Sequence, residues 1–202
     1  MDNPRYRNGF SLTLHPDQLE LPLKWRQPRR IFVNSMSDLF HEAIPDEYIR
    51  KVFAVMEAAP WHVFQVLTKR PRRMAALAPT LPWPEHIWAG TSIELDRFSW
   101  RANQYLSQVP PVVRFVSAEP LLGPLPSLDL NELAWVIAGG ESGPRHRPCD
   151  PVWVRDLRDR CQSAGVAFFL KQWGGRTTKA GGRSLDGRTW DEYPAARHAV
   201  VL

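Results

Sequence analysis

The amino-acid sequence predicts an α/β protein built around a mainly parallel sheet of about six strands. Six short apolar runs rich in β-branched and aromatic residues recur along the chain at intervals of roughly 25–30 residues. Such nearly continuous apolar runs are typical of strands buried on both faces, as parallel strands are. Segments with helical periodicity lie between several of the runs. This alternation favours either a doubly wound sheet or an arc of a βα barrel.

The predicted strands lie at residues 31–33, 63–67, 87–90, 112–116, 135–138 and 166–170. Between the first two strands, residues 45–58 predict a helix. Pro45 suits a first helical turn, and Asp46 and Glu47 complement the positive end of the helix dipole.

A second helix is predicted over residues 151–164, with Asp150 as its N-cap and Gly165 as its stop signal. The periodicity is weaker over residues 97–107, where we expect a less regular helix, and a short helix is expected to follow Pro71.

The two ends of the chain do not fit the repeating pattern. Residues 1–30 are basic, rich in proline and arginine, and aperiodic, so they predict an irregular N-terminal segment. Residues 31–173 contain the whole strand–helix repeat and are expected to form the βα domain. Residues 174–202 are rich in glycine and predict a C-terminal tail or cap.

Composition limits the class of protein. The chain has 202 residues, of which 44% are hydrophobic and 23% charged, which is typical of a globular domain rather than a disordered one. No apolar run approaches the roughly 18 residues that a membrane-spanning helix needs, and the N-terminus does not resemble a signal peptide. We therefore expect a cytoplasmic protein without a membrane partner.

The formal net charge is +5 at pH 7, and the basic excess lies at the two ends of the chain. Such an excess permits a nucleic-acid partner but does not demonstrate one. The candidates for nucleic-acid binding are Arg70, Arg72, Arg73, Arg145 and Arg147.

Polar residues follow the ends of the predicted strands. In parallel α/β folds these carboxyl ends form the functional rim. The candidate catalytic residues there are Lys69, Glu119, Glu141 and Lys171. An amine is costly at the end of an apolar strand without a partner, so Lys171 is expected to pair with Glu119 or Glu141. A glycine-rich turn at residues 139–143 has backbone N–H groups that can receive an anion or a cofactor.

The two cysteines, Cys149 and Cys161, do not form a CxxC pair, and two thiols at this spacing predict neither a zinc site nor a cluster site. Cys161 falls in the apolar row of the helix predicted at 151–164. We expect both thiols to be reduced and no metal to be bound.

Several strings of the sequence carry a resemblance to a known family. They are IFVNSMSDLFH (31–41), LTKRP (67–71), SAEPLL (117–122), AGGESG (138–143) and FLKQWG (169–174). Over about residues 4–175 the chain is similar to a phage-associated protein family of unknown function. Full-length members carry an N-terminal three-cysteine motif that resembles the iron–sulfur loop of radical S-adenosylmethionine (radical-SAM) enzymes. The resemblance implies a partial βα barrel of the radical-SAM or TIM-like type.

The resemblance also implies that the rim residues line a cavity for cofactor and substrate. The cofactor-binding candidates are Ser35, Ser37, Asp38, Thr91, Ser92, Glu94, Ser117, Gly139, Gly140, Ser142, Gly143 and Gln172. The sequence Gly139-Gly140-Glu141 is not equated with the glycine-glycine-glutamate element of radical-SAM enzymes, because that element normally lies much earlier in the chain.

The chain departs from the family pattern in one respect: the three cluster cysteines are missing, and Cys149 and Cys161 cannot replace them. Either the coding start lies further upstream, or the chain has been shortened, or it is a natural form without these cysteines. S-adenosylmethionine and an iron–sulfur cluster are implied for full-length relatives, whereas no cofactor is expected to be bound by this chain.

Three functions follow as hypotheses. The first is a radical-SAM-like protein that supplies the barrel but not the cluster loop, with no reductive cleavage by this chain and an unknown reaction. The second is a non-enzymatic nucleic-acid-binding module. The third is a metal-independent lyase or hydrolase that uses Lys69 or Lys171. A barrel open on one side would also allow a homodimer.

Overall fold

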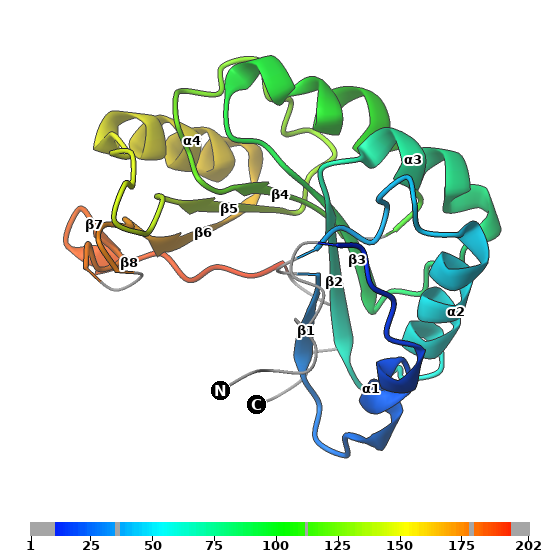
Figure 1. Cartoon of the computed structure of the whole chain (residues 1–202). Helices are drawn as coiled ribbons and strands as arrows, with labels where there is room; N and C mark the ends of the chain where they lie inside the picture. Colours follow the sequence, from blue (N-terminus) through cyan, green and yellow to red (C-terminus); the bar gives the residue numbers. More distant parts are fainter. Residues whose placement is uncertain (1–10, 35–36, 112, 178–179, 195–202) are drawn as a thin grey trace.

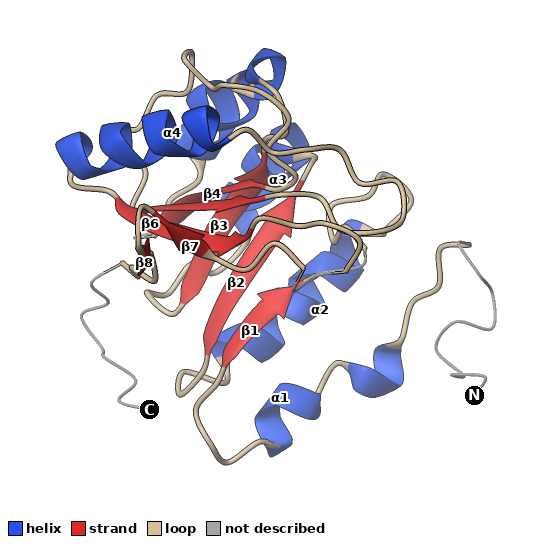
Figure 2. Ribbon diagram, turned by 90° about the vertical axis from the view of Figure 1, so that its left-hand side faces the viewer, coloured by secondary structure: helices blue, strands red, loops and turns tan. Residues whose placement is uncertain are grey.

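The computed structural model describes residues 11–34, 37–111, 113–177 and 180–194. Its centre is a six-stranded sheet in the order β1-β2-β3-β4-β5-β6, with every neighbouring pair parallel. The strands are β1 (Arg30–Val33), β2 (Val63–Thr68), β3 (Ile87–Ser92), β4 (Arg114–Ala118), β5 (Trp135–Gly139) and β6 (Ala167–Gln172). The sheet curls into a half-barrel with helices on its outer face (Figures 1 and 2). The predicted partial βα barrel is therefore confirmed.

The helices are α1 (Leu21–Lys24), α2 (Asp46–Glu57), α3 (Pro71–Leu77) and α4 (Pro151–Ala164). The helices predicted at 45–58, after Pro71 and at 151–164 are thus confirmed. The Asp150 side chain accepts a hydrogen bond of 2.8 Å from the Val152 amide, and Gly165 ends α4 with φ at +68°. These are the two signals from which the limits of this helix were predicted.

The helix predicted over residues 97–107 is wrong as a single α-helix. The segment forms 3₁₀ turns η4 (Asp96–Phe98) and η6 (Leu106–Gln108) on either side of a π turn, η5 (Arg101–Tyr105). Local side chains bind the neighbouring 127–129 loop: Asp96 accepts from Ser127, and Asn103 donates to the Ser127 carbonyl. Further 3₁₀ turns are η2 (Pro16–Gln18) and η3 (Ala78–Thr80).

Two apolar layers hold the sheet. The outer layer lies between the strands and the helices, and it includes Phe53 of α2, Phe64 of β2 and Leu157 of α4. The inner layer, which we call the floor, fills the concave side with Val63, Trp88, Val113, Phe115, Trp135 and Ile137. Gly90 makes room for it, because a Cβ on Gly90 would lie 2.4 Å from the Phe115 ring.

Buried His62 attaches the N-terminal segment to the start of β2. Its Nδ1 accepts a hydrogen bond of 3.1 Å from the Arg29 amide, and its Nε2 donates to the Pro22 carbonyl at 3.0 Å. Trp25, Trp61 and Phe64 contact the imidazole edge to face. The part of the N-terminal segment from Pro22 to Arg29 is therefore held against the start of β2.

The C-terminal segment extends beyond β6 into a hairpin of β7 (Ser184–Leu185) and β8 (Arg188–Thr189). The chain then returns along the edge of β6, where the Leu170 amide donates to the Trp190 carbonyl at 2.9 Å. Tyr193 follows, and its ring contacts the floor residue Trp135 at a tilt and the neighbouring Phe169 edge to face. This segment covers the β6 edge and the amino end of the half-barrel.

The start predicted for the fourth strand was too early. The strand was predicted from residue 112, but β4 begins at Arg114, and Val112 lies outside the described residues. No helix in the described part of the chain has the length and apolar character that crossing a membrane requires.

Candidate functional site

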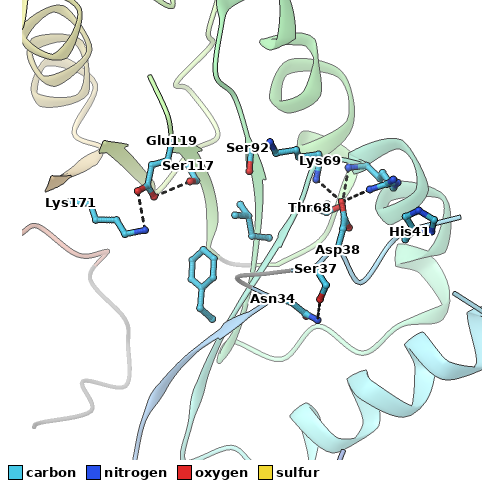
Figure 3. A pocket seen from close by; sticks show the side chains of 13 residues that line it. Asn34, Ser37, Asp38, His41, Thr68, Lys69, Ser92, Ser117, Glu119 and Lys171 are labelled. Atoms are coloured by element: carbon cyan, nitrogen blue, oxygen red, sulfur yellow. Dashed lines mark hydrogen bonds and ion pairs between the residues drawn. The ribbon is translucent and has the colours of Figure 1, made fainter. Parts of the chain in front are cut away.

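A cavity of about 920 Å³ opens at the carboxyl ends of the strands. It is lined by Phe32, Asn34, Ser37, Asp38, His41, Leu67, Thr68, Lys69, Arg70, Ser92, Ser117, Glu119 and Lys171. Figure 3 shows Lys171 and Glu119 on one side, Asp38 and Lys69 on the other, and Ser92 between them. Side chains of five strands or their following loops thus share one cavity, as expected for a parallel barrel.

Strand register explains why these side chains meet. Ser92 of β3 pairs with Ser117 of β4, and two residues earlier on each strand Gly90 pairs with Phe115. Because side chains alternate between the two faces of a strand, serines at these positions stand directly above the apolar floor. Glu119 follows two residues after Ser117 and lies on the same side. The cavity therefore has an apolar base and a polar rim.

Asp38 is fully occupied by hydrogen bonds. Its Oδ1 accepts from the Thr68 hydroxyl at 2.6 Å and the Phe40 amide at 3.0 Å. Its Oδ2 accepts from the Lys69 amide and from Arg70 Nη1, both at 3.0 Å. This carboxylate fixes the loop after β1 against the end of β2, and it has little capacity left for a ligand.

Glu94 lies between two cations, Lys69 and Arg101. Arg101 Nη1 donates to Glu94 Oε2 at 3.2 Å and to the Ser92 carbonyl at 2.8 Å, and Lys69 Nζ contacts Glu94 Oε1. Burial opposes ionisation of Glu94, but hydrogen bonding to Lys69 and the charges of both cations outweigh it and lower the pKa of Glu94. Glu94 is therefore a carboxylate, and the group of three side chains has one excess positive charge.

Glu119 and Lys171 form the second charged pair of the cavity. Lys171 Nζ lies 3.0 Å from Glu119 Oε2, and the Ser117 hydroxyl donates to Glu119 Oε1 at 3.1 Å. Gly139 leaves space for this carboxylate, because a Cβ there would lie 2.9 Å from Glu119 Oε2. The predicted pairing of Lys171 with a rim carboxylate is confirmed, and the partner is Glu119.

Glu141 lies outside the cavity lining and pairs with Arg147. Arg147 donates to Glu141 from its amide, Nε and Nη2, each at 2.8 Å. The side-chain hydrogen bonds and then the backbone hydrogen bond from Arg147 lower the pKa of Glu141 to about 2. Glu141 is thus a half-buried residue that holds its own loop through Arg147, and Lys171 pairs with Glu119 instead.

The glycine-rich turn after β5 packs against the loop after β6. The Gly140 amide donates to the Gln172 carbonyl at 2.8 Å, and the Gly143 amide donates to the Gly175 carbonyl at 2.9 Å. A Cβ on Gly140 would lie 2.0 Å from the Trp173 carbonyl oxygen. These amides were predicted to be open to an anion or cofactor. They are instead used inside the protein, because the two backbones pack closely.

The cofactor-binding candidates differ in their positions relative to the cavity. Ser37, Asp38, Ser92 and Ser117 line the cavity, and Glu94 and Gly139 support it from behind. Gly140, Ser142, Gly143 and Gln172 belong to the packed loops, where Gln172 donates to the Ser142 hydroxyl at 2.9 Å. Thr91 is buried and donates to the Thr68 carbonyl. Ser35 lies outside the described residues.

Three of the five candidate nucleic-acid-binding arginines are held by carboxylates. Arg70 contacts Asp38 and Glu42, Arg73 contacts Asp46, and Arg147 contacts Glu141. Arg72 and Arg145 are exposed. Hence only part of the predicted basic set is presented to a partner as unpaired charge.

Six residues that line or support the cavity were not among the candidate site residues: Phe32, Asn34, His41, Leu67, Thr68 and Arg101. Phe32 and Leu67 lie on the strands themselves, two residues before Asn34 and Lys69, so strand alternation was the signal for them. His41 comes from the loop after β1 and Arg101 from the π turn η5, and no periodic pattern marks them.

The cysteines do not fit an iron–sulfur cluster. Burial raises the pKa of the Cys149 thiol to about 11 and that of Cys161 to about 12, whereas cluster ligands are thiolates. Cys161 packs in the outer apolar layer on α4. Across the described ranges, no group of three or more histidine, cysteine, aspartate or glutamate side chains is arranged to hold a metal ion.

Comparison with known proteins gives a family but no described function. No curated protein and no solved structure matches the chain. A family model described as "Protein of unknown function (DUF5131)" matches residues 2–194, which is nearly the whole chain. The chain therefore belongs to this family of proteins of unknown function.

Proposed function

We propose that the half-barrel is the cofactor- and substrate-holding part of a radical-SAM-like, phage-associated protein, and that its cavity binds S-adenosylmethionine, in contrast to the expectation from the missing cysteines that this chain binds no cofactor. The sequence resemblance to such a family supports the proposal. A parallel half-barrel with a polar cavity at the carboxyl ends of its strands is the expected scaffold. The volume of about 920 Å³ suits a ligand of this size.

The observation that carries the proposal is the contact between Lys171 and Glu119. An amino-acid group carries an ammonium and a carboxylate, and a lysine–glutamate pair offers the complementary charges side by side. The Lys171 side chain is 55% exposed and has spare N–H donors, so it can bind the carboxylate without leaving Glu119. Ser117 and Gly139 hold Glu119 in the position that this requires.

The role of this chain is limited to binding and orientation. When bound, S-adenosylmethionine would supply a sulfonium centre, and the apolar floor would limit the access of water to the base of the cavity. Because the cysteines do not fit a cluster, no reductive step is derived for this chain.

The test is isothermal titration of the protein with S-adenosylmethionine. Lys171→Met and Glu119→Gln should each lower the affinity about tenfold or more, since each removes one charge–charge contact. Lys51→Met and Glu47→Gln are matched controls, because these residues form an exposed pair on α2. Absence of saturable binding, or equal affinity in the two cavity variants and the two controls, would contradict the proposal.

The same contact favours a second candidate function, the metal-independent lyase or hydrolase. An amine beside a carboxylate is also the arrangement of a Schiff-base lysine with its general base. In that reaction the amine adds to a substrate carbonyl and water leaves, forming an imine. Borohydride supplies hydride to reduce the imine, so a panel of aldehydes and ketones should give a stable mass increase on Lys171 or Lys69. An unmodified protein with every carbonyl compound rejects this candidate.

A further inference from the structure

Between the pair of Lys171 and Glu119 and the opposite side of the cavity lies a hydroxyl group that the proposed function does not use, that of Ser92 (Figure 3). The Ser92 side chain is 4% exposed, lines the cavity, and makes no hydrogen bond through its hydroxyl among the described residues. The hydroxyl oxygen is not among the fully buried polar atoms that lack a partner, so it is open to the cavity. Ser92 can therefore donate a hydrogen bond to a ligand group that binds there.

The charge next to Ser92 is positive. Glu94 is shared by Lys69 and Arg101, so two cations surround one carboxylate. Arg101 is 12% exposed and is held at the Ser92 carbonyl, so it cannot move to a ligand without losing these bonds. Lys69 is 55% exposed and lines the cavity, and two of its three N–H donors remain for a ligand.

The neighbouring charges do not cancel this excess within the cavity. Asp38 and Glu42 share Arg70, so these three side chains carry one excess negative charge. However, Asp38 is filled by four donors, and Glu42 is 72% exposed and lies outside the cavity lining, where solvent screens its charge. On the opposite side Glu119 is neutralised by Lys171. Lys69 therefore differs from Lys171: its carboxylate partner, Glu94, is also paired with Arg101, so the positive charge of Lys69 is not fully balanced.

We propose that Lys69 and Ser92 form an oxyanion subsite that binds a carboxylate or phosphate group of the substrate. The subsite rests on the proposed function in taking this cavity as the place where substrate is held. It assigns the two ends of the cavity to different ligands, with the amino-acid part of the cofactor at Lys171–Glu119 and an acidic substrate at Lys69–Ser92. The recognised chemistry is an oxyanion, which receives ammonium and hydroxyl hydrogen bonds.

The experiment titrates the full chain with inorganic phosphate and, separately, with acetate, following intrinsic tryptophan fluorescence at constant ionic strength. Saturable binding of either anion in the millimolar range supports the subsite. Binding of phosphate alone identifies a phosphate-bearing substrate, and equal binding of both shows that a carboxylate suffices.

Variants separate the subsite from a general effect of charge. Lys69→Met should weaken anion binding about tenfold and Ser92→Ala about threefold, whereas Lys51→Met, which removes a paired surface lysine, should leave it unchanged. Glu94→Gln should strengthen anion binding, because it raises the local charge while keeping the side-chain shape. A merely structural role of Glu94 predicts the opposite sign. Circular dichroism verifies that each variant is folded.

Two results would overturn the proposal: no saturable binding of phosphate or acetate up to tens of millimolar, or unchanged binding in Lys69→Met. Titration of the same samples with S-adenosylmethionine keeps this outcome distinct from failure of the proposed function. Lys171→Met should lose cofactor affinity and retain anion affinity, and Lys69→Met should do the reverse.

Discussion

The guanidinium carbon of Arg30 lies 4.0 Å from the ring centroid of Tyr193. Arg30 is the first residue of β1, and Tyr193 contacts Trp135 and Phe169 of β5 and β6. This cation–π contact joins the two edge regions of a sheet that does not close on itself, so residues 163 positions apart meet across the amino end of the half-barrel.

Tyr193→Ala should lower the free energy of unfolding by about 1–2 kcal/mol, because two aromatic contacts and one cation–π contact are lost. Urea denaturation measures the change. Arg30→Met isolates the cation–π part, and a double-mutant cycle should give a coupling of about 0.5–1 kcal/mol. Additive single effects would show that the two residues do not interact.

His62→Ala should destabilise the protein by about 2–4 kcal/mol, because it empties a fully buried site and breaks two hydrogen bonds. It should also loosen the N-terminal segment, so that trypsin cleaves more rapidly after Lys24, Arg26 and Arg29 under native conditions. Mass spectrometry of the fragments checks this. The exposed substitution Val152→Ala on α4 should leave these sites protected. Equal cleavage rates in the wild type and His62→Ala would contradict the role of His62.

Gly139→Ala should mainly lower ligand affinity, whereas Gly140→Ala should mainly lower the stability of the fold. A Cβ on Gly139 meets the flexible end of Glu119, so the fold should tolerate it within about 1 kcal/mol while S-adenosylmethionine affinity falls. A Cβ on Gly140 meets the Trp173 backbone, so stability should fall by about 2 kcal/mol or more. Thermal denaturation and titration calorimetry measured together distinguish them. Equal stability loss in both would show that Gly139 serves packing rather than the site.

The pair of Glu141 and Arg147 should stabilise the fold only above moderately acidic pH. The folded-state pKa of Glu141 is lowered from 4.5 to about 2, so its contribution is fully present above pH 4.5. The contribution is lost as the pH falls from about 4.5 to 2, where the carboxylate takes up a proton in the folded state. Comparison of wild-type and Glu141→Gln melting temperatures at pH 7 and pH 2.5 tests this. The difference should be much smaller at pH 2.5 than at pH 7, and a difference of equal size at both pH values would assign the effect to packing.

The sequence predicted the regular parts of this fold because their causes are local. Apolar runs located the six strands, and Asp150 with Gly165 located both ends of α4. The segment after β3 was not predicted correctly, because Asn103 and Asp96 bind a loop that lies over 20 residues further along the chain. These hydrogen bonds to a distant loop compete with regular helix formation in this segment, and the local sequence alone does not reveal them.

The candidate site was predictable where strand order alone decides position. Glu119, Lys171 and Ser92 follow or end parallel strands, and they share the cavity for that reason. Glu141 also follows a strand, but Arg147 six residues later holds it outside. The role of Arg101 depends on a side chain that reaches back from an irregular turn to Glu94, and no spacing rule describes such a contact.

The floor of Trp88, Phe115, Trp135 and its neighbours gives the cavity an apolar base, while its charged side chains lie at the rim. A ligand with a hydrocarbon part and an ionic part should therefore lie with the hydrocarbon part against the base. The cavity thus selects the orientation of a bound molecule as well as its chemical class.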